Sequence, residues 1–326
     1  MPAVETARGA IEVADLGTTL MHEHVFVLST EHVQNYGDTW WDEDERVTDA
    51  VAKLNELKSL GVDSIVDPTV WGLGRYIPRI QTIAAQTDLN IIVATGLYFD
   101  DEVPHQYTYR GPGLLVDLEV DPMVTDFTRD ITEGIADTGV KAAFLKCIVE
   151  HKGLTPGAER ILTACARTSN ETGAPITVHT SSAVGAGRLA KDLFATQGVD
   201  LTKVVIGHAG DSNDLDYLKE LADAGCLLGM DRFGLDIFNP TDQRVATIAS
   251  LAAQGYADRM VLAHDASCFI DYFPGAEGIA AKETFAPNWN FRHISDDVLP
   301  MLREAGVTEA QLTTMLVDNP RRYFGG

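Results

Sequence analysis

The chain has 326 residues, 45% of them hydrophobic, and its formal net charge is −23. Such acidity argues against nucleic acids and anionic membranes as partners, since both are bound by basic surfaces, and a small neutral substrate fits it best. No apolar run reaches the length of a membrane span, no signal peptide is visible over Met1–Thr18, and the four cysteines lack CxxC spacing. We therefore expect a cytoplasmic protein with reduced thiols.

The elements follow a repeated plan along the chain. Residues 1–17 are expected to form a short hairpin or cap, and the first apolar strand follows over Leu20–Val27. An amphipathic helix is predicted over Arg46–Leu60, and Gly61 ends it. From there a helix, a glycine and a short β-branched run recur, and the predicted strands are Ser64–Asp67, Asn90–Thr95, Ala142–Lys146, Pro175–His179, Lys203–His208, Cys226–Asp231 and Met260–Asp265.

Eight strands that alternate with helices predict an α/β fold with parallel pairing and right-handed crossovers. The strands are apolar throughout, as is typical of strands that are buried on both faces. A (β/α)8 TIM barrel fits this pattern better than an open doubly wound sheet, and no GxGxxG motif follows the first strand. With no linker or low-complexity segment, residues 1–326 are predicted to form a single domain.

Residues that can bind metals fall at the predicted strand ends. His22 and His24 are two apart, so both project from one face of a strand and can bind the same ion while Glu23 points away. Each such residue alone fits a hydrogen-bonded core histidine or a solvated lysine. Because the active sites of these barrels lie at the C-terminal strand ends, the four histidines His22, His24, His179 and His208 together with Asp265 predict a metal centre. Lys146 ends another strand at the same end of the barrel.

The other five histidines do not share this placement as a set, and we assign them no metal role. They are His32, His105, His151, His264 and His293.

The chain resembles the phosphotriesterase family of the amidohydrolase superfamily, and in particular its phosphotriesterase-like lactonases. The matching motifs run from end to end: Leu20–His24, Asp67–Arg75, Thr95–Tyr98, Leu145–Lys146, His179–Thr180, Gly207–Asp211, Gly229–Gly234, His264–Asp265 and Asp318–Arg322. The resemblance implies two divalent metal ions per chain. By similarity, His22, His24 and Asp265 bind the buried ion, His179 and His208 bind the more exposed ion, and Lys146 bridges both.

A lysine ammonium group cannot bind a cation, so the resemblance implies that Lys146 is carbamylated. Carbon dioxide converts the neutral amine into an anionic group with two oxygens, and burial near cations would favour the neutral amine. Nitrogen and oxygen ligands suit zinc, cobalt, manganese or iron, and zinc is our default expectation.

The reaction implied by the resemblance is attack of a metal-bridging hydroxide on a lactone carbonyl. Asp265 could act as general acid–base, and Tyr98 could orient the hydroxide or donate to the lactone. The structural alternative for Tyr98 is a residue packed at the barrel rim. Arg232 is expected near the mouth as an organiser of the substrate loop rather than as a catalyst.

Substrate choice is predicted to depend on the aromatic segment Ala266–Ile294, which includes Trp289. Its aromatic side chains could form a channel for an acyl chain, or they could equally cover the barrel or join subunits. The lactonase resemblance favours N-acyl-homoserine lactones, hence quorum quenching, with weak phosphotriesterase activity at the same site.

Three alternatives remain open. The enzyme could chiefly hydrolyse other γ- or δ-lactones, it could be an organophosphate hydrolase, or the barrel could bind metal without catalysis. The resemblance also suggests a homodimer, for which residues 70–73 (Val-Trp-Gly-Leu) are a plausible contact.

Overall fold

The computed structural model describes residues 2–37, 40–273 and 275–325. Met1 and Gly326, at the ends of the predicted domain, and Pro274, in the predicted substrate segment, lie outside the described residues, as do Asp38 and Thr39.

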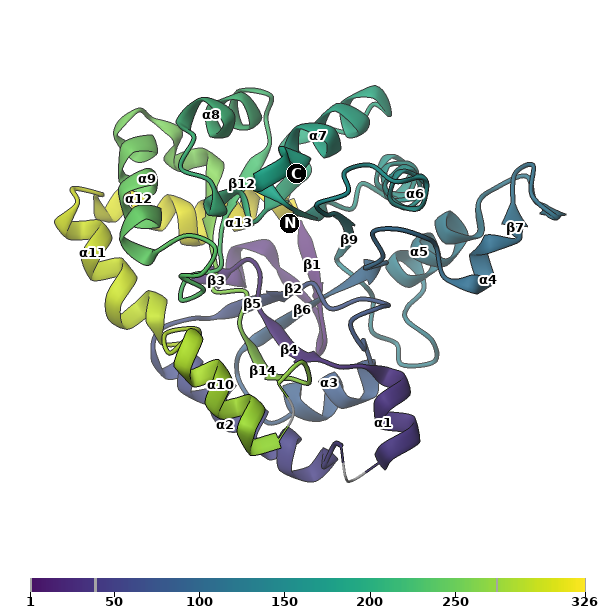
Figure 1. Ribbon diagram of the computed structural model, residues 1–326, viewed down its shortest axis with the longest axis horizontal. Helices are drawn as coiled ribbons and strands as arrows, with labels where there is room; N and C mark the ends of the chain where they lie inside the picture. Colours follow the sequence, from purple (N-terminus) through teal and green to yellow (C-terminus); the bar gives the residue numbers. More distant parts are fainter. Residues whose placement is uncertain (1, 38–39, 274, 326) are drawn as a thin grey trace.

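Eight parallel strands form the centre of the molecule, and helices surround them (Figure 1). In order around the sheet they are β13 (Met260–Leu262), β12 (Leu227–Met230), β11 (Val204–Gly207), β10 (Ile176–Thr180), β9 (Phe144–Val149), β6 (Asn90–Gly96), β5 (Ser64–Asp67) and β3 (Thr19–Leu20). Backbone bonds join the two outer strands, because Met21 N–H donates to the carbonyl oxygen of Leu262 at 3.1 Å. The predicted (β/α)8 barrel is confirmed.

Most strands are linked by a helix that covers the outside of the barrel. These helices are α2 (Glu43–Ser59), α3 (Ile77–Ala84), α5 (Pro122–Thr132), α6 (Pro156–Thr172), α7 (Ala186–Thr196), α8 (Leu215–Asp223) and α9 (Thr241–Ala253). Helix α6 shows how the sequence sets their limits. The Thr155 hydroxyl accepts from Ala158 N–H, Pro156 occupies the first turn, and Gly173 ends the helix in a left-handed conformation.

The first predicted strand, Leu20–Val27, is wrong as a continuous strand. Its first part, β3, pairs with β5, whereas β4 (His24–Val27) pairs with β14 (Ser267–Ile270) outside the eight-stranded sheet. Between them the chain changes partner: Met21 N–H bonds to β13, but Glu23 N–H donates to the carbonyl oxygen of Val66 at 3.0 Å. The segment that carries His22 is therefore irregular.

Both termini close the end of the barrel opposite the strand C-termini. An antiparallel pair, β1 (Ala3–Thr6) and β2 (Gly9–Glu12), packs beside β6, and Ala7 N–H donates to the carbonyl oxygen of Ile91 at 2.8 Å. Helix α13 (Asn319–Gly325) places the Tyr323 hydroxyl 2.9 Å from that of Thr177, on β10. The open end of the barrel is thus the one where the strands terminate.

The remaining elements are short or lie in the loops. They are α1 (Thr30–Tyr36), α4 (His105–Thr108), β7 (Arg110–Gly111), β8 (Val116–Asp117), α10 (Gly275–Phe285), α11 (Leu299–Glu304) and α12 (Glu309–Thr313), with π-helical turns over Ile294–Val298 and Thr314–Asp318. Across the described ranges, none of the helices is both long and apolar enough to cross a membrane.

The segment Val70–Leu73 cannot serve as a whole as the subunit contact expected from the sequence. Val70 and Leu73 are buried within the chain, because they pack into the core, and Trp71 is the half-exposed aromatic of the segment. Homodimer formation itself stays a prediction.

Candidate metal centre

The six predicted metal-binding residues lie together at the open end of the barrel. Lys146 and His179 belong to β9 and β10, while His208 and Asp265 follow β11 and β13. Positive φ angles occur at four described residues other than glycine, and three of them are here: His208 (63°), Arg232 (61°) and Asp265 (54°). Backbone in this region costs free energy and clusters at functional sites.

Glycine before His208 permits close approach of the strands. A Cβ atom at Gly207 would lie 2.9 Å from the carbonyl oxygen of Val178 and 3.5 Å from Cε1 of His22. The Gly-His pair therefore brings the His208 ring near the His22 ring, and the two ring centroids are 4.9 Å apart.

His22, His24 and Asp265 form the first group. Oδ1 of Asp265 lies 3.4 Å from Nε2 of His22 and 3.3 Å from Nε2 of His24. The opposite ring nitrogen of His24, Nδ1, lies 2.7 Å from the hydroxyl oxygen of Thr69. Two imidazole nitrogens and a carboxylate oxygen that converge in this way fit one divalent cation.

His179 and His208 form the second group. Nδ1 of His179 lies 2.9 Å from Nε2 of His208. The other nitrogen of each ring donates to a carboxylate: Nε2 of His179 to Glu150 at 2.5 Å, and Nδ1 of His208 to Asp231 at 2.8 Å. With neutral rings, two lone pairs then face each other with no proton between them, which fits a cation bound by both.

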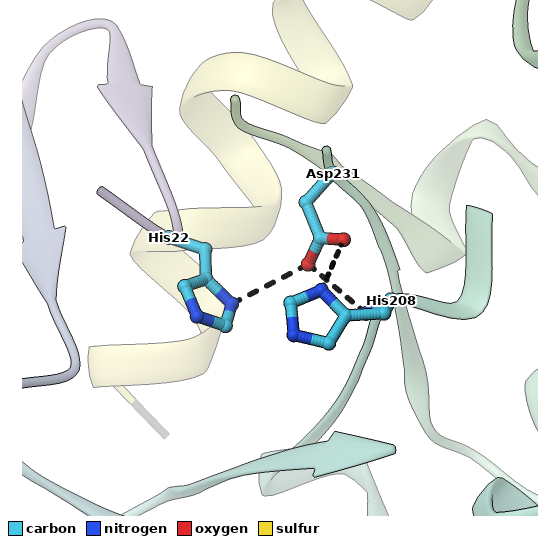
Figure 2. A group of neighbouring side chains, drawn as sticks. All are labelled: His22, His208 and Asp231. Carbon is cyan, nitrogen blue, oxygen red and sulfur yellow. Dashed lines mark hydrogen bonds and ion pairs between the residues drawn. The ribbon is translucent and has the colours of Figure 1, made fainter. Parts of the chain in front are cut away.

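Asp231 links the two groups, as Figure 2 shows. Its carboxylate accepts from the ring and the backbone N–H of His208, and its Oδ2 lies 3.4 Å from Nδ1 of His22. Nδ1 of His22 is buried and has no hydrogen-bond partner among the described residues. One buried carboxylate thus faces Nδ1 of both rings and leaves Nε2 of each directed at the centre.

Lys146 is buried beside His22. Its side chain is 1% exposed, and Nζ lies 3.2 Å from Nε2 of His22. Burial, opposed by Asp265 and Asp231, lowers the pKa of Lys146 to about 8. The neutral amine is therefore far more accessible here than on a surface lysine.

The histidines of the two groups differ in their proton affinity. Burial lowers the pKa of His179 to about 4 and also lowers the pKa values of His22 and His208. Burial would lower the pKa of His24 as well, but the carboxylates of Asp265 and Asp67 outweigh it and raise it to about 9. Metal ligands must be deprotonated, so burial of His22, His179 and His208 favours the ring form that binds a metal.

Tyr98 lies beside the second group. Its hydroxyl is 3.2 Å from Nδ1 of His179, and burial together with the Asp265 carboxylate raises its pKa above the ordinary value. Tyr98 therefore remains an O–H donor at the edge of the centre.

Arg232 lies at the mouth of the barrel, as expected from the sequence, and its guanidinium is paired with carboxylates. Nε donates to Asp265 Oδ2 at 3.2 Å, and Nη1 donates to Asp211 Oδ2 at 2.8 Å. Arg244 donates to the other Asp211 oxygen at 2.6 Å. Asp265 and Asp211 neutralise the partly buried guanidinium, which also lies 4.6 Å from the ring centroid of Phe238 in the segment after β12. The role of Arg232 as an organiser of the substrate loop stays a prediction.

A cavity of about 280 Å³ opens above the centre. Trp289 lines it as predicted from the sequence, and its indole N–H is shared between the carbonyl oxygens of His264 and Asp265. Most of the remaining wall is apolar and comes from Val27, Leu73, Leu235, Ile237, Phe238, Ile270, Tyr272, Phe273 and Phe285.

Sequence reasoning missed Glu150, Asp231 and the wall after β12. Asp231 precedes Arg232 in a motif already noted. The available indication of a second wall was the segment Phe233–Phe238, in which four of six side chains are large and apolar. Conversely, Phe269 and Phe291 do not line the cavity: Phe269 packs against Trp41, and Phe291 against His264.

Comparison with known proteins agrees with this geometry. A sequence model of the phosphotriesterase family matches residues 2–324. The chain is 54% identical to a protein of Mycobacterium tuberculosis described as "Phosphotriesterase homology protein", over 99% of this chain and 98% of that one. It is 36% identical to the "Aryldialkylphosphatase" of Saccharolobus solfataricus, over 97% and 98% of the two chains.

A solved structure is similarly close. The structure described as "Structure of the phosphotriesterase from Mycobacterium tuberculosis" superposes with a TM-score of 0.96 at 54% identity, covering 99% of this chain and 98% of that chain. Together with the histidine and carboxylate groups at the strand ends, these matches confirm the resemblance of the sequence. The chain belongs to the phosphotriesterase family and is a metal-dependent hydrolase.

Proposed function

We propose that this hydrolase acts on N-acyl-homoserine lactones and so serves quorum quenching. The main support is the contrast within its cavity: a polar floor of histidines and carboxylates lies beneath a largely apolar wall. A lactone ring with a neutral ester fits the floor, and an acyl chain fits the wall.

The charges of the cavity favour a neutral substrate. Arg232, the guanidinium that lines it within the described ranges, already contacts Asp265 and Asp211. It therefore offers no unpaired cation to an anionic group. The net charge of −23 adds a long-range repulsion against anionic substrates.

Two divalent ions, with zinc as the default, are proposed to bind at the two groups. When bound, they would polarise the scissile carbonyl and lower the pKa of a water molecule. His22, His24 and Asp265 would hold one ion, and His179 and His208 the other.

Lys146 is proposed to complete the centre as a carbamate. Its neutral Nζ would form a bond to the carbon of carbon dioxide as one C=O π bond opens, and would release one proton. The product is a carbamate with one negative charge shared by two oxygens. Its burial and its lowered pKa favour the neutral amine that this step needs. A carbamate signal in ¹³C NMR after incubation with labelled bicarbonate would test it directly.

The remaining roles follow from the position of each side chain. Tyr98, which keeps its proton, is placed to donate a hydrogen bond to the substrate oxygen at the edge of the second group. Asp265 is the candidate for moving a proton to the leaving alkoxide, and Arg232 orients its carboxylate through the 3.2 Å contact. Trp289 forms part of the cavity wall.

A second candidate is an organophosphate hydrolase, because a relative with 36% identity is described as an aryldialkylphosphatase. The deciding experiment compares kcat/KM for acyl-homoserine lactones of increasing chain length, simple γ- and δ-lactones, and paraoxon on metal-loaded enzyme. The proposal requires the acyl-homoserine lactones to lead by at least about tenfold, which is 1.4 kcal/mol in transition-state binding. A higher kcat/KM for paraoxon or for simple lactones would contradict the proposal and would identify that compound class as the substrate instead.

A further inference from the structure

A second cavity lies behind the wall of the first one. Its volume is about 280 Å³, and it is bounded by helices α2 and α10, which Figure 1 shows near β14. It shares Ser267, Ile270, Phe273 and Trp289 with the cavity above the metal centre, but no candidate metal ligand lines it. It is therefore a separate compartment with a common wall.

Three cationic side chains line this second cavity, and two of them have partners. The Arg46 guanidinium lies 4.4 Å from the ring centroid of Phe269, and its Nη1 is 3.4 Å from the Glu45 carboxylate. Nζ of Lys53 donates to Asp49 at 2.7 Å and to the carbonyl oxygen of Cys268 at 2.8 Å.

Lys282 is different. Its Nζ lies 4.6 Å from the ring centroid of Trp289, and it makes no ion pair with any carboxylate of the described chain. Burial and the nearby charge of Lys53 lower its pKa, and the neighbouring Glu283 offsets this in part. Lys282 is partly buried, and because an ion pair offsets the cost of burying a charge, its ammonium group is a candidate anchor for an anion.

The wall supplies one further unused polar group. The hydroxyl of Ser267 is buried and has no hydrogen-bond partner within the described ranges. The rest of the lining combines apolar side chains, among them Phe269, Ile270, Phe273 and Ile279, with the carboxylates of Asp49 and Glu283. Asp49 is already paired with Lys53 at 2.7 Å.

We propose that this cavity is a binding site for an alkyl carboxylate, with the carboxylate on Lys282 and the chain along the apolar wall. An anion would pair with the unneutralised ammonium and could accept from the Ser267 hydroxyl. The volume of about 280 Å³ leaves room for an alkyl chain beside the carboxylate.

A ligand bound in this cavity would affect the metal centre through Trp289, which contacts both. Its ring faces Lys282 on one side, while its N–H binds the carbonyl oxygens of His264 and Asp265 on the other. Recruitment of Lys282 to a carboxylate would change the packing of this indole. Its fluorescence, one of four tryptophan signals in the chain, is accordingly a probe of binding.

The test is titration of the metal-loaded enzyme with octanoate, followed by tryptophan fluorescence and calorimetry. We expect one saturable site with Kd below about 1 mM. Lys282→Met, which keeps the length of the side chain but removes its charge, should weaken binding by about tenfold or more. Ile279 is 40% exposed, so Ile279→Asp should leave folding intact and should weaken binding as well.

Lys219→Met is the matched control, because this lysine lies on α8 and does not line the cavity. It should bind octanoate as the wild type does. Equal binding by the wild type and Lys282→Met, or no saturable binding up to about 10 mM, would overturn the proposal. Since binding is measured without turnover, failure of the lactonase proposal would leave this result interpretable.

Two sources could supply the ligand, a fatty acid or the hydroxy acid released from a lactone. Octanoate and 4-hydroxyoctanoate should therefore be compared in the same titration. Tighter binding of the hydroxy acid by about tenfold would identify the site as a product site, and similar or tighter binding of octanoate would identify it as a fatty-acid site.

Discussion

The floor and the rim of the cavity above the metal centre differ in burial, polarity and backbone geometry. The floor consists of side chains that are almost fully buried, such as Lys146 and His208. The rim carries apolar side chains that water reaches, among them Ile237 at 62% and Phe238 at 53% exposure. The floor comes from strand ends, whereas the rim comes from the segments after β12 and β14.

The two regions have different physical requirements. At the floor, Nδ1 of His22 is buried without a hydrogen-bond partner among the described residues, and leaving such a group unsatisfied costs about 1–3 kcal/mol. The rest of the fold tolerates this cost, as it tolerates the positive φ of His208 and Asp265. The rim has no comparable constraint, so its residues can vary without loss of the centre.

Lys146→Ala should have the largest effect, because it removes the one buried amine at the floor. If Lys146 carries the carbamate, metal content should fall and activity should drop by about 10³-fold or more, while circular dichroism shows a folded barrel. Acetate or propionate should restore part of both by filling the vacated space. Lys219→Ala is the control on an exposed face.

Two metals per chain and near-normal turnover in untreated Lys146→Ala would contradict the carbamate. These results would also indicate that Lys146 serves only in packing, and for such a residue the substitution is expected to change stability alone.

Tyr98→Phe should harm lactone hydrolysis more than phosphotriester hydrolysis. Loss of one hydrogen bond that acts mainly in the transition state costs about 10²-fold in kcat, and a substrate with an activated leaving group depends less on it. The measurement is kcat for both substrate classes at equal metal content. Tyr256→Phe, which removes a surface hydrogen bond to Asp223, is the control. Equal losses for both substrates would refute the assigned role.

Asp231→Asn should weaken metal binding rather than the chemical step. The carboxylate accepts from His208 and faces Nδ1 of His22, so the amide should lower metal affinity by about 10–100-fold. Chelator competition measures this affinity, and excess metal should restore most of the turnover. Asp216→Asn, at a carboxylate that is 95% exposed, is the matched control. Unchanged affinity would show that Asp231 positions neither ring.

The floor was more predictable from the sequence than the rim for a physical reason. A metal ligand needs a particular side chain at a strand end, so His179 or Lys146 can be recognised from its position after an apolar run. The backbone around His22 is irregular, but the predicted position of His22 at the centre still holds. Asp265 N–H donates to the His22 carbonyl oxygen and so keeps the two residues together.

The supporting carboxylates and the rim were less predictable. Glu150 and Asp231 act through contacts across strands that their spacing does not reveal. At the rim, any large apolar side chain can fill the same space, so Phe269 and Phe273 look alike in the sequence although only Phe273 lines the cavity above the centre. The burial of Arg232 depends on Asp211, which lies 21 residues away in the chain.

Phe238→Ala should have the smallest effect, and it should distinguish the contribution of the rim to substrate binding from the contribution of the floor to turnover. Phe238 is half exposed, so its removal costs an acyl chain only part of one aromatic contact, about 1 kcal/mol or a few-fold in KM. We expect the increase in KM to grow with acyl length while kcat stays constant, and Leu115→Ala, at an exposed residue away from the cavity, should change neither. The ring also lies 4.6 Å from Cζ of Arg232, which offers a competing explanation. If Phe238 acts through that arginine, kcat will instead fall by the same factor for short and long chains, because the Asp265 contact is common to all substrates.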